Sequence, residues 1–175
     1  MRILVAALLL AGAAAAQTRV SRVSLAAMEA SFDRRVLSVD VTDPFMLLGT
    51  TRGLYLSGYG AVFTAEVNLI ASAVNSPFRP EFTKQEIARI RQKKQYRVTL
   101  LKQHMRNALI GAAASLDGVP INEQIVLGVS LFYFNWEDRS GLPAQVVMQA
   151  PKKALLEAGK GNPAPLEAVL QVQEY

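Results

Sequence analysis

The sequence contains no cysteine and only one histidine, His104. The absence of cysteine excludes disulfide scaffolds, thiol nucleophiles, iron–sulfur clusters and zinc sites built on thiolates. With a single imidazole, most histidine-based catalysis and metal binding are excluded as well. We therefore expect no metal site and no cofactor.

Long apolar runs are also missing. A membrane-spanning helix needs about 20 apolar residues, whereas the longest run here, Ile3 to Ala11, is about half that length. Met1-Arg2 precedes this run and Ala14-Ala15-Ala16 follows it, which is the pattern of a secretory signal peptide over residues 1–16. We expect an exported protein, periplasmic or secreted. Without cysteine there is no lipid attachment site, and no transmembrane segment is expected after cleavage.

The sequence lacks the common catalytic signatures as well. It has no Gly-x-Ser-x-Gly elbow, no Ser-x-x-Lys motif and no His-Glu-x-x-His helix. The glycine-rich stretch 53–60 is followed by neither Lys-Ser nor Lys-Thr, so it predicts a hairpin turn and not a phosphate-binding loop. We assign no catalytic residue from the sequence, and an enzyme is the less favoured class.

The strongest positive feature is a concentration of basic residues. Between Arg79 and Arg106 the chain carries nine basic and two acidic residues. Clustered cations attract phosphates, anionic polymers and acidic protein surfaces, although such a cluster is more often simply a solvated helix face. Nucleic acid is not expected for an exported chain. The predicted contact residues are Arg89, Arg91, Lys93, Lys94, Arg97, Lys102 and Arg106, with Tyr59 in the glycine turn as a second patch.

These basic residues lie on a predicted long helix. Thr83 and Glu86 form a capping-box pattern at its start, and apolar residues then recur at helical spacing to Leu116. Lys94 interrupts the apolar stripe in its first half. We therefore expect that half to extend beyond the body of the protein, with a kink as the alternative.

The rest of the chain predicts mostly strands. Period-two alternation and turn residues indicate strands at 36–41, 54–56, 61–70, 125–136, 145–150 and 166–173, with shorter helices at 19–32 and 151–158. Hairpins on either side of one long helix favour a single α+β domain over residues 17–175. We expect two layers, with a mainly antiparallel sheet of about five or six strands packed on the long amphipathic helix.

Three functional hypotheses follow. The first is an exported soluble binding protein, without catalysis, that contacts an anionic polymer or an acidic protein surface through the basic helix. In this hypothesis, changing Arg91, Lys93, Lys94 and Arg97 to Glu abolishes binding and leaves the fold intact. The second is a hydrolase-like enzyme with an acidic site in the 136–143 loop, near Trp136, Glu137 and Asp138. The third is a self-assembling envelope protein, a homo-oligomer formed through the apolar stripe at Ile87, Ile90 and Val98.

Overall fold

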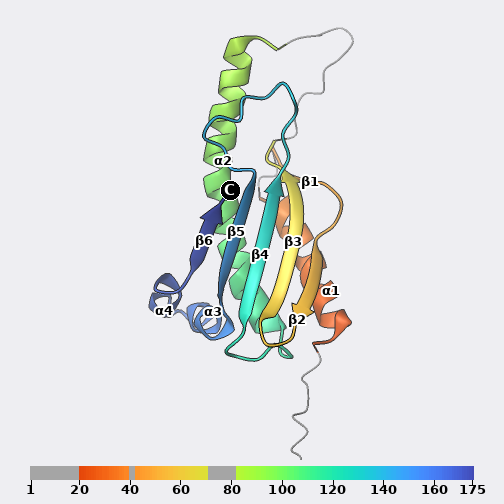
Figure 1. Cartoon of the computed structure of the whole chain (residues 1–175), viewed down its shortest axis with the longest axis vertical. Helices are drawn as coiled ribbons and strands as arrows, with labels where there is room; N and C mark the ends of the chain where they lie inside the picture. The colour runs from red at the N-terminus through yellow and green to blue at the C-terminus, as the bar shows by residue number, and fades with distance from the viewer. Residues whose placement is uncertain (1–19, 40–41, 71–81) are drawn as a thin grey trace, which may run out of the picture.

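A computed structural model of the chain describes residues 20–39, 42–70 and 82–175. The polypeptide forms a sheet of six strands with two helices on one side and two short helices at one end (Figure 1). In chain order the elements are α1 (Arg22–Leu37), β1 (Met46–Leu47), β2 (Arg52–Leu56), β3 (Gly60–Asn68), α2 (Lys84–Ser115), β4 (Gln124–Leu131), β5 (Gln145–Pro151), α3 (Lys152–Gly159), α4 (Ala164–Glu167) and β6 (Gln171–Glu174).

The sheet is mainly antiparallel, as the sequence predicts. β1 and β2 both pair with β3, and the order then continues β3-β4-β5-β6. Only β3 and β4 are parallel, with Ala61 opposite Ile125 and Val67 opposite Leu131. Parallel neighbours need a crossover connection, and α2 lies within it. The α+β class and the long helix against the sheet are confirmed.

The core lies between the helices and one face of the sheet. Inward-facing residues of β3, β4 and β5 alternate with outward-facing ones, and Phe63, Leu127 and Met148 are buried against apolar residues of α1 and α2. Both long helices lie behind the sheet in Figure 1, whereas no helix of the described residues covers the front face. The domain therefore has two layers and one uncovered sheet face.

Helix α2 begins as its sequence predicts. The Thr83 side chain accepts a hydrogen bond from the Glu86 backbone, and the Glu86 carboxylate accepts one from the Thr83 backbone. The helix continues without interruption to Ser115, and its N-terminal part extends past the end of the sheet (Figure 1). The predicted projection is therefore seen relative to the sheet, but the first half of the helix does not extend beyond the body of the protein as expected, because Lys94, Arg97 and Val98 are buried there. At the other end the buried Lys152 ammonium donates to the carbonyls of Leu116 and Val119, at 2.7 and 2.8 Å.

Two strand predictions are wrong. Val36 and Leu37 belong to α1, which runs to Leu37, while residues 40 and 41 lie outside the described residues. The buried face of α1 is formed by Leu25, Met28, Phe32 and Val36, so one helical stripe continues through the residues expected to begin a strand. The last predicted strand also begins late, because Leu166 is buried in the short helix α4 and pairing starts at Gln171.

Strand β4 is shorter than the predicted 125–136. It ends at Leu131, opposite Val67 near the end of β3, so the ladder stops where its neighbour stops. The Phe132 N–H still donates to the Val67 carbonyl, and the chain then leaves the sheet as a loop to β5. The loop that begins at Phe132 and carries Phe134 and Trp136 therefore lies beyond the end of β4, alongside the projecting end of α2 (Figure 1).

Candidate functional site: the basic tip

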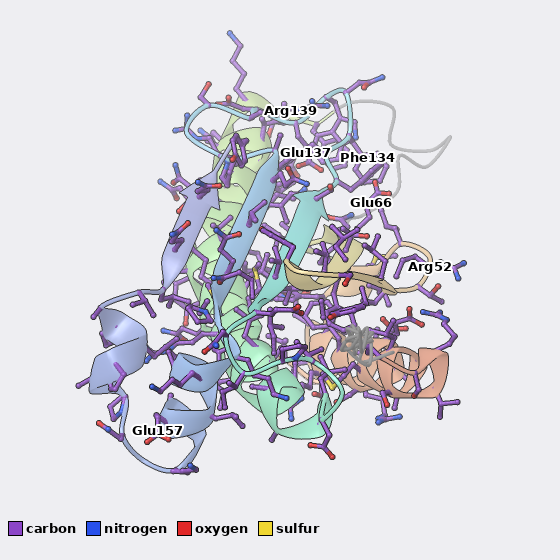
Figure 2. The ribbon with its side chains drawn as sticks, turned by 60° about the horizontal axis from the view of Figure 1, so that its bottom comes forward. Arg52, Glu66, Phe134, Glu137, Arg139 and Glu157 are labelled. Atoms are coloured by element: carbon purple, nitrogen blue, oxygen red, sulfur yellow. The ribbon has the colours of Figure 1, made fainter. Side chains whose placement is uncertain are left out.

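The projecting end of the molecule consists of residues 82–97 of α2 and its N-cap segment, together with the loop 132–143. We call this end the basic tip, because its sequence holds seven basic and three acidic residues. Figure 2 shows Phe134, Glu137 and Arg139 of the loop gathered here, with Glu157 of α3 at the opposite end. The tip contains most of the residues that the sequence predicts as contacts.

Lys94 and Glu137 form an ion pair in the interior of the tip. The Lys94 ammonium lies 2.5 Å from a Glu137 carboxylate oxygen, and both side chains are almost completely inaccessible, at 0% and 1%. The ammonium also donates to the Phe132 carbonyl at 3.2 Å and lies over the Tyr133 ring. Burial lowers the pKa of Lys94, an effect that the Glu137 carboxylate opposes. The pair therefore binds the loop to α2.

The same environment affects Tyr133. Burial raises the pKa of its phenol to about 12, and the nearby Glu137 carboxylate acts in the same direction. The phenol donates a hydrogen bond to the Pro143 carbonyl at 2.7 Å. Tyr133 is thus a neutral hydrogen-bond donor that joins the two ends of the loop.

A second set of ion pairs holds the segment before β1. The Arg97 guanidinium donates to the Asp43 carboxylate at 2.9 Å and to its backbone carbonyl at 2.6 Å, and it lies over the Phe45 ring. Lys93 approaches the same carboxylate at 2.5 Å. Arg97 is buried, whereas the Lys93 side chain is half exposed. Lys93 and Arg97 therefore lie along one side of the apolar stripe of α2, and this is the side that faces Asp43.

Arg91 lies on the other border and pairs with the loop. Its guanidinium is 3.0 Å from the Asp138 carboxylate, and both side chains are about one-third exposed. Hydrogen bonds from Ser140 and the charge of Arg91 hold the pKa of Asp138 below its usual value. Four predicted contact residues, Arg91, Lys93, Lys94 and Arg97, therefore already bind acidic groups of their own chain.

Three exposed cations of the tip, unlike the exposed Lys93, pair with no acidic residue of the described part of the chain. Lys84 and Arg89 make no ion pair within the described part of the chain, and Arg139 is held only by the Tyr133 carbonyl at 3.4 Å and the Tyr133 ring. Arg89 was predicted from the sequence. Lys84 and Arg139 were not, although Lys84 belongs to the same basic run and Arg139 to the loop considered for an acidic site.

Aromatic rings form a column on the tip. The Phe82 and Trp136 rings are stacked with centroids 4.0 Å apart, Trp136 and Phe134 are parallel at 5.7 Å, and Phe134 meets Phe132 edge to face at 5.0 Å. All four are half-buried and lie outside the buried core cluster. We call this group the aromatic column. Its signal in the sequence is the alternation of Phe132, Phe134 and Trp136, which predicts a strand and not a separate cluster.

The other predicted contacts lie elsewhere. Lys102 pairs with Glu174 of β6 at 2.7 Å, and Arg106 pairs with Glu167 of α4. Tyr59 is 43% exposed in the β2–β3 turn, and its hydroxyl is 3.1 Å from the Gln149 side-chain oxygen across β4. This turn is at the start of β4 and the tip is at its end, about 25 Å away along the strand. The structure therefore does not bring Tyr59 together with the basic helix end.

The residues on which the enzyme and self-assembly hypotheses depend make contacts with other parts of the same chain. Glu137 is buried against Lys94, and Asp138 is bound by Arg91, so neither carboxylate of the proposed acidic site is free. The apolar stripe suggested for self-assembly faces the protein's own interior, since Val98 is buried and Ile90 packs on the core. His104 is half-buried, and burial together with the charge of Arg35 lowers its pKa.

Residues 20–39, 42–70 and 82–175 contain no group of three or more acidic, histidine or cysteine residues placed to hold a metal ion. None of their helices combines the length and apolar character needed to cross a bilayer. Comparison with models of protein families, with curated proteins and with solved structures gave no match to this chain.

Proposed function

We propose that this protein is an exported, non-catalytic binding protein that contacts an anionic partner through the basic tip. The observation that carries the proposal is the exposure of Lys84, Arg89 and Arg139 on the projecting end of the molecule. Clustered cations raise the local concentration of anionic partners and accelerate their association. The anionic partner is the one predicted from the sequence, but the proposed contact residues are now Lys84, Arg89 and Arg139.

The internal ion pairs support this choice of residues. Lys94 and Arg97 are 0% and 3% exposed and therefore offer no surface to a partner. A carboxylate at position 94 would face Glu137 in the interior, so the four-residue charge reversal suggested by the sequence would disrupt the loop as well as any binding. The exposed cations can be changed without this penalty.

The proposal is tested by sedimentation of the chain from Gln17 onwards with heparin, an anionic polymer, at about 50 and about 500 mM salt. We expect a complex at low salt that weakens at high salt. The double variant Lys84→Glu/Arg89→Glu should lose most of this binding. The control variant Lys153→Glu/Lys160→Glu makes the same charge change on α3 and its C-cap residue, at the opposite end, and should retain heparin binding (Figure 1).

Two results would refute the proposal. One is the absence of any heparin complex at low salt. The other is an equal loss of binding in the two double variants, because the net charge and not the tip would then determine the interaction.

A further inference from the structure

The aromatic column gives the basic tip a second chemical property. Four half-buried rings lie outside the core, on the part of the chain that extends past the sheet. A surface that carries cations alone selects only for negative charge, whereas cations beside aromatic rings also select for an apolar region next to that charge. The tip has both.

The ring arrangement bears on which ligand fits. Carbohydrates stack on a free aromatic face, but the Phe82 ring stacks on the Trp136 ring with centroids 4.0 Å apart, and Phe134 lies parallel to Trp136 at 5.7 Å, so the indole is already engaged with other rings of the protein. Each of the four rings is still partly accessible. Ring edges with apolar carbon and an indole N–H suit the boundary between headgroups and acyl chains, where Trp is enriched.

The charges of the tip complement an anionic bilayer. Lys84, Arg89 and Arg139 are exposed, and the half-exposed Lys93 adds to the local positive potential. The tip has three acidic residues against seven basic ones, and each is engaged within the chain: Glu137 is buried with Lys94, Asp138 is paired with Arg91, and the Glu86 carboxylate accepts hydrogen bonds from Thr83 at the start of α2. Each cation near an anionic leaflet strengthens binding about fivefold.

The shape of the molecule allows such a contact. The tip projects beyond the sheet, while α3 and α4 lie at the opposite end (Figure 1). Among the described elements, a flat surface can therefore reach the tip before it meets the sheet or the helices at the opposite end.

We infer that the basic tip docks on the surface of a membrane that contains anionic lipids, with the aromatic column at the level of the headgroups. This inference rests on the proposed function and names the partner of the same surface. It requires no spanning segment, because the contact is peripheral.

The experiment uses the chain from Gln17 onwards, which contains every described residue. It is mixed with vesicles of phosphatidylcholine, with or without phosphatidylglycerol. Trp136 is the only tryptophan of the protein and belongs to the column, so its emission reports directly on the proposed contact. We expect sedimentation only with phosphatidylglycerol vesicles, a blue shift of the Trp136 emission, and quenching by lipids brominated on their acyl chains.

Variants separate charge from insertion. Lys84→Gln/Arg89→Gln should weaken vesicle binding about 25-fold, as expected for two cations, whereas Lys153→Gln/Lys160→Gln should bind as the wild type does. Phe82→Ala, which removes the end of the column and keeps Trp136, should reduce both binding and the blue shift. Circular dichroism of each variant verifies that α2 is intact.

The outcomes distinguish this inference from the proposed function. If vesicles bind but brominated lipids leave Trp136 unquenched, the inference is wrong and only electrostatic contact remains. If heparin or an acidic protein binds and anionic vesicles do not, the membrane partner is refuted while the proposed function stands. If neither heparin nor vesicles bind, both are refuted.

Discussion

Replacement of Lys94 by Met tests the central packing argument. The change leaves the Glu137 carboxylate buried without its cation and removes the donor to the Phe132 carbonyl. Breaking a buried ion pair by removal of one partner costs about 3–5 kcal/mol, a large part of the 5–15 kcal/mol that is typical for a domain. We therefore expect Lys94→Met to be severely destabilised.

Replacement of Glu137 as well should restore much of the stability that Lys94→Met loses. In Lys94→Met/Glu137→Leu both charges are replaced by apolar groups, and such replacements leave stability near or above that of the paired protein. We expect the double variant to lie within about 1–2 kcal/mol of the wild type. The resulting coupling energy between the two residues, about 3 kcal/mol or more, would exceed that of most contacting pairs.

Urea unfolding with two probes measures these differences. Circular dichroism follows the helices, and the fluorescence of Trp136, next to Glu137, follows the loop. The matched control is Lys102→Met, which removes a partly exposed ion pair with Glu174 and should cost less than about 1 kcal/mol. A cost for Lys94→Met as small as that of the control, or a double variant no more stable than the single variants, would refute the reasoning.

Two further predictions concern stability at other places in the fold. Burial raises the pKa of Glu29, but hydrogen bonds from Arg22 and the Gly53 backbone outweigh it and hold the pKa below the usual 4.5. The stabilisation is then present above about pH 4.5 and is lost as the pH falls through the folded value, so urea midpoints should decline on acidification less steeply for Glu29→Gln than for the wild type. Lys152→Met removes the donor to two carbonyls at the end of α2 and should cost about 2 kcal/mol in thermal unfolding. The exposed Lys153→Met is its control, and equal losses in the two would contradict the capping role.

Local sequence signals predicted the elements whose formation depends on neighbours along the chain. The capping box at Thr83 and Glu86 marks the start of α2, and the glycine turn marks the β2–β3 hairpin, with φ of +79° at Gly58 and +141° at Gly60. A Cβ at position 60 would come within 1.9 Å of the Gln124 carbonyl oxygen, so glycine is required there. Such signals act over a few residues and can be read without knowledge of the fold.

The roles of the basic residues could not be predicted in the same way. The partners of Arg91, Arg97 and Lys102 are 47, 54 and 72 positions away in the chain. The spacing of the cations shows which helix face they occupy, but only the sheet order determines which acidic groups reach that face. Lys94 gave the one usable clue, because a lysine in the middle of an apolar stripe needs a buried partner.

The shortening of β4 has a comparable cause. The alternation of apolar residues continues past Leu131 to Trp136, so the pattern itself contains no sign of an end. The ladder stops because β3, its parallel neighbour, ends at Asn68. Strand length is thus determined by the partner, and the aromatic residues that the partner cannot pair form the column on the tip instead.

The positions of Lys84 and Arg89 in α2 indicate whether their charges serve stability or function. Lys84 is the first residue of α2, where the positive end of the helix dipole disfavours a cation, whereas Arg89 lies in the second turn, where this effect has largely faded. Neither makes an ion pair in the described part of the chain, so no described contact offsets this cost. Residues that oppose a local stability rule without structural compensation are expected mainly at functional positions.

On this reasoning, Lys84→Glu/Arg89→Glu should unfold at the same or a higher temperature than the wild type while it loses binding to anionic partners. Destabilisation of this variant would instead assign the two cations a structural role.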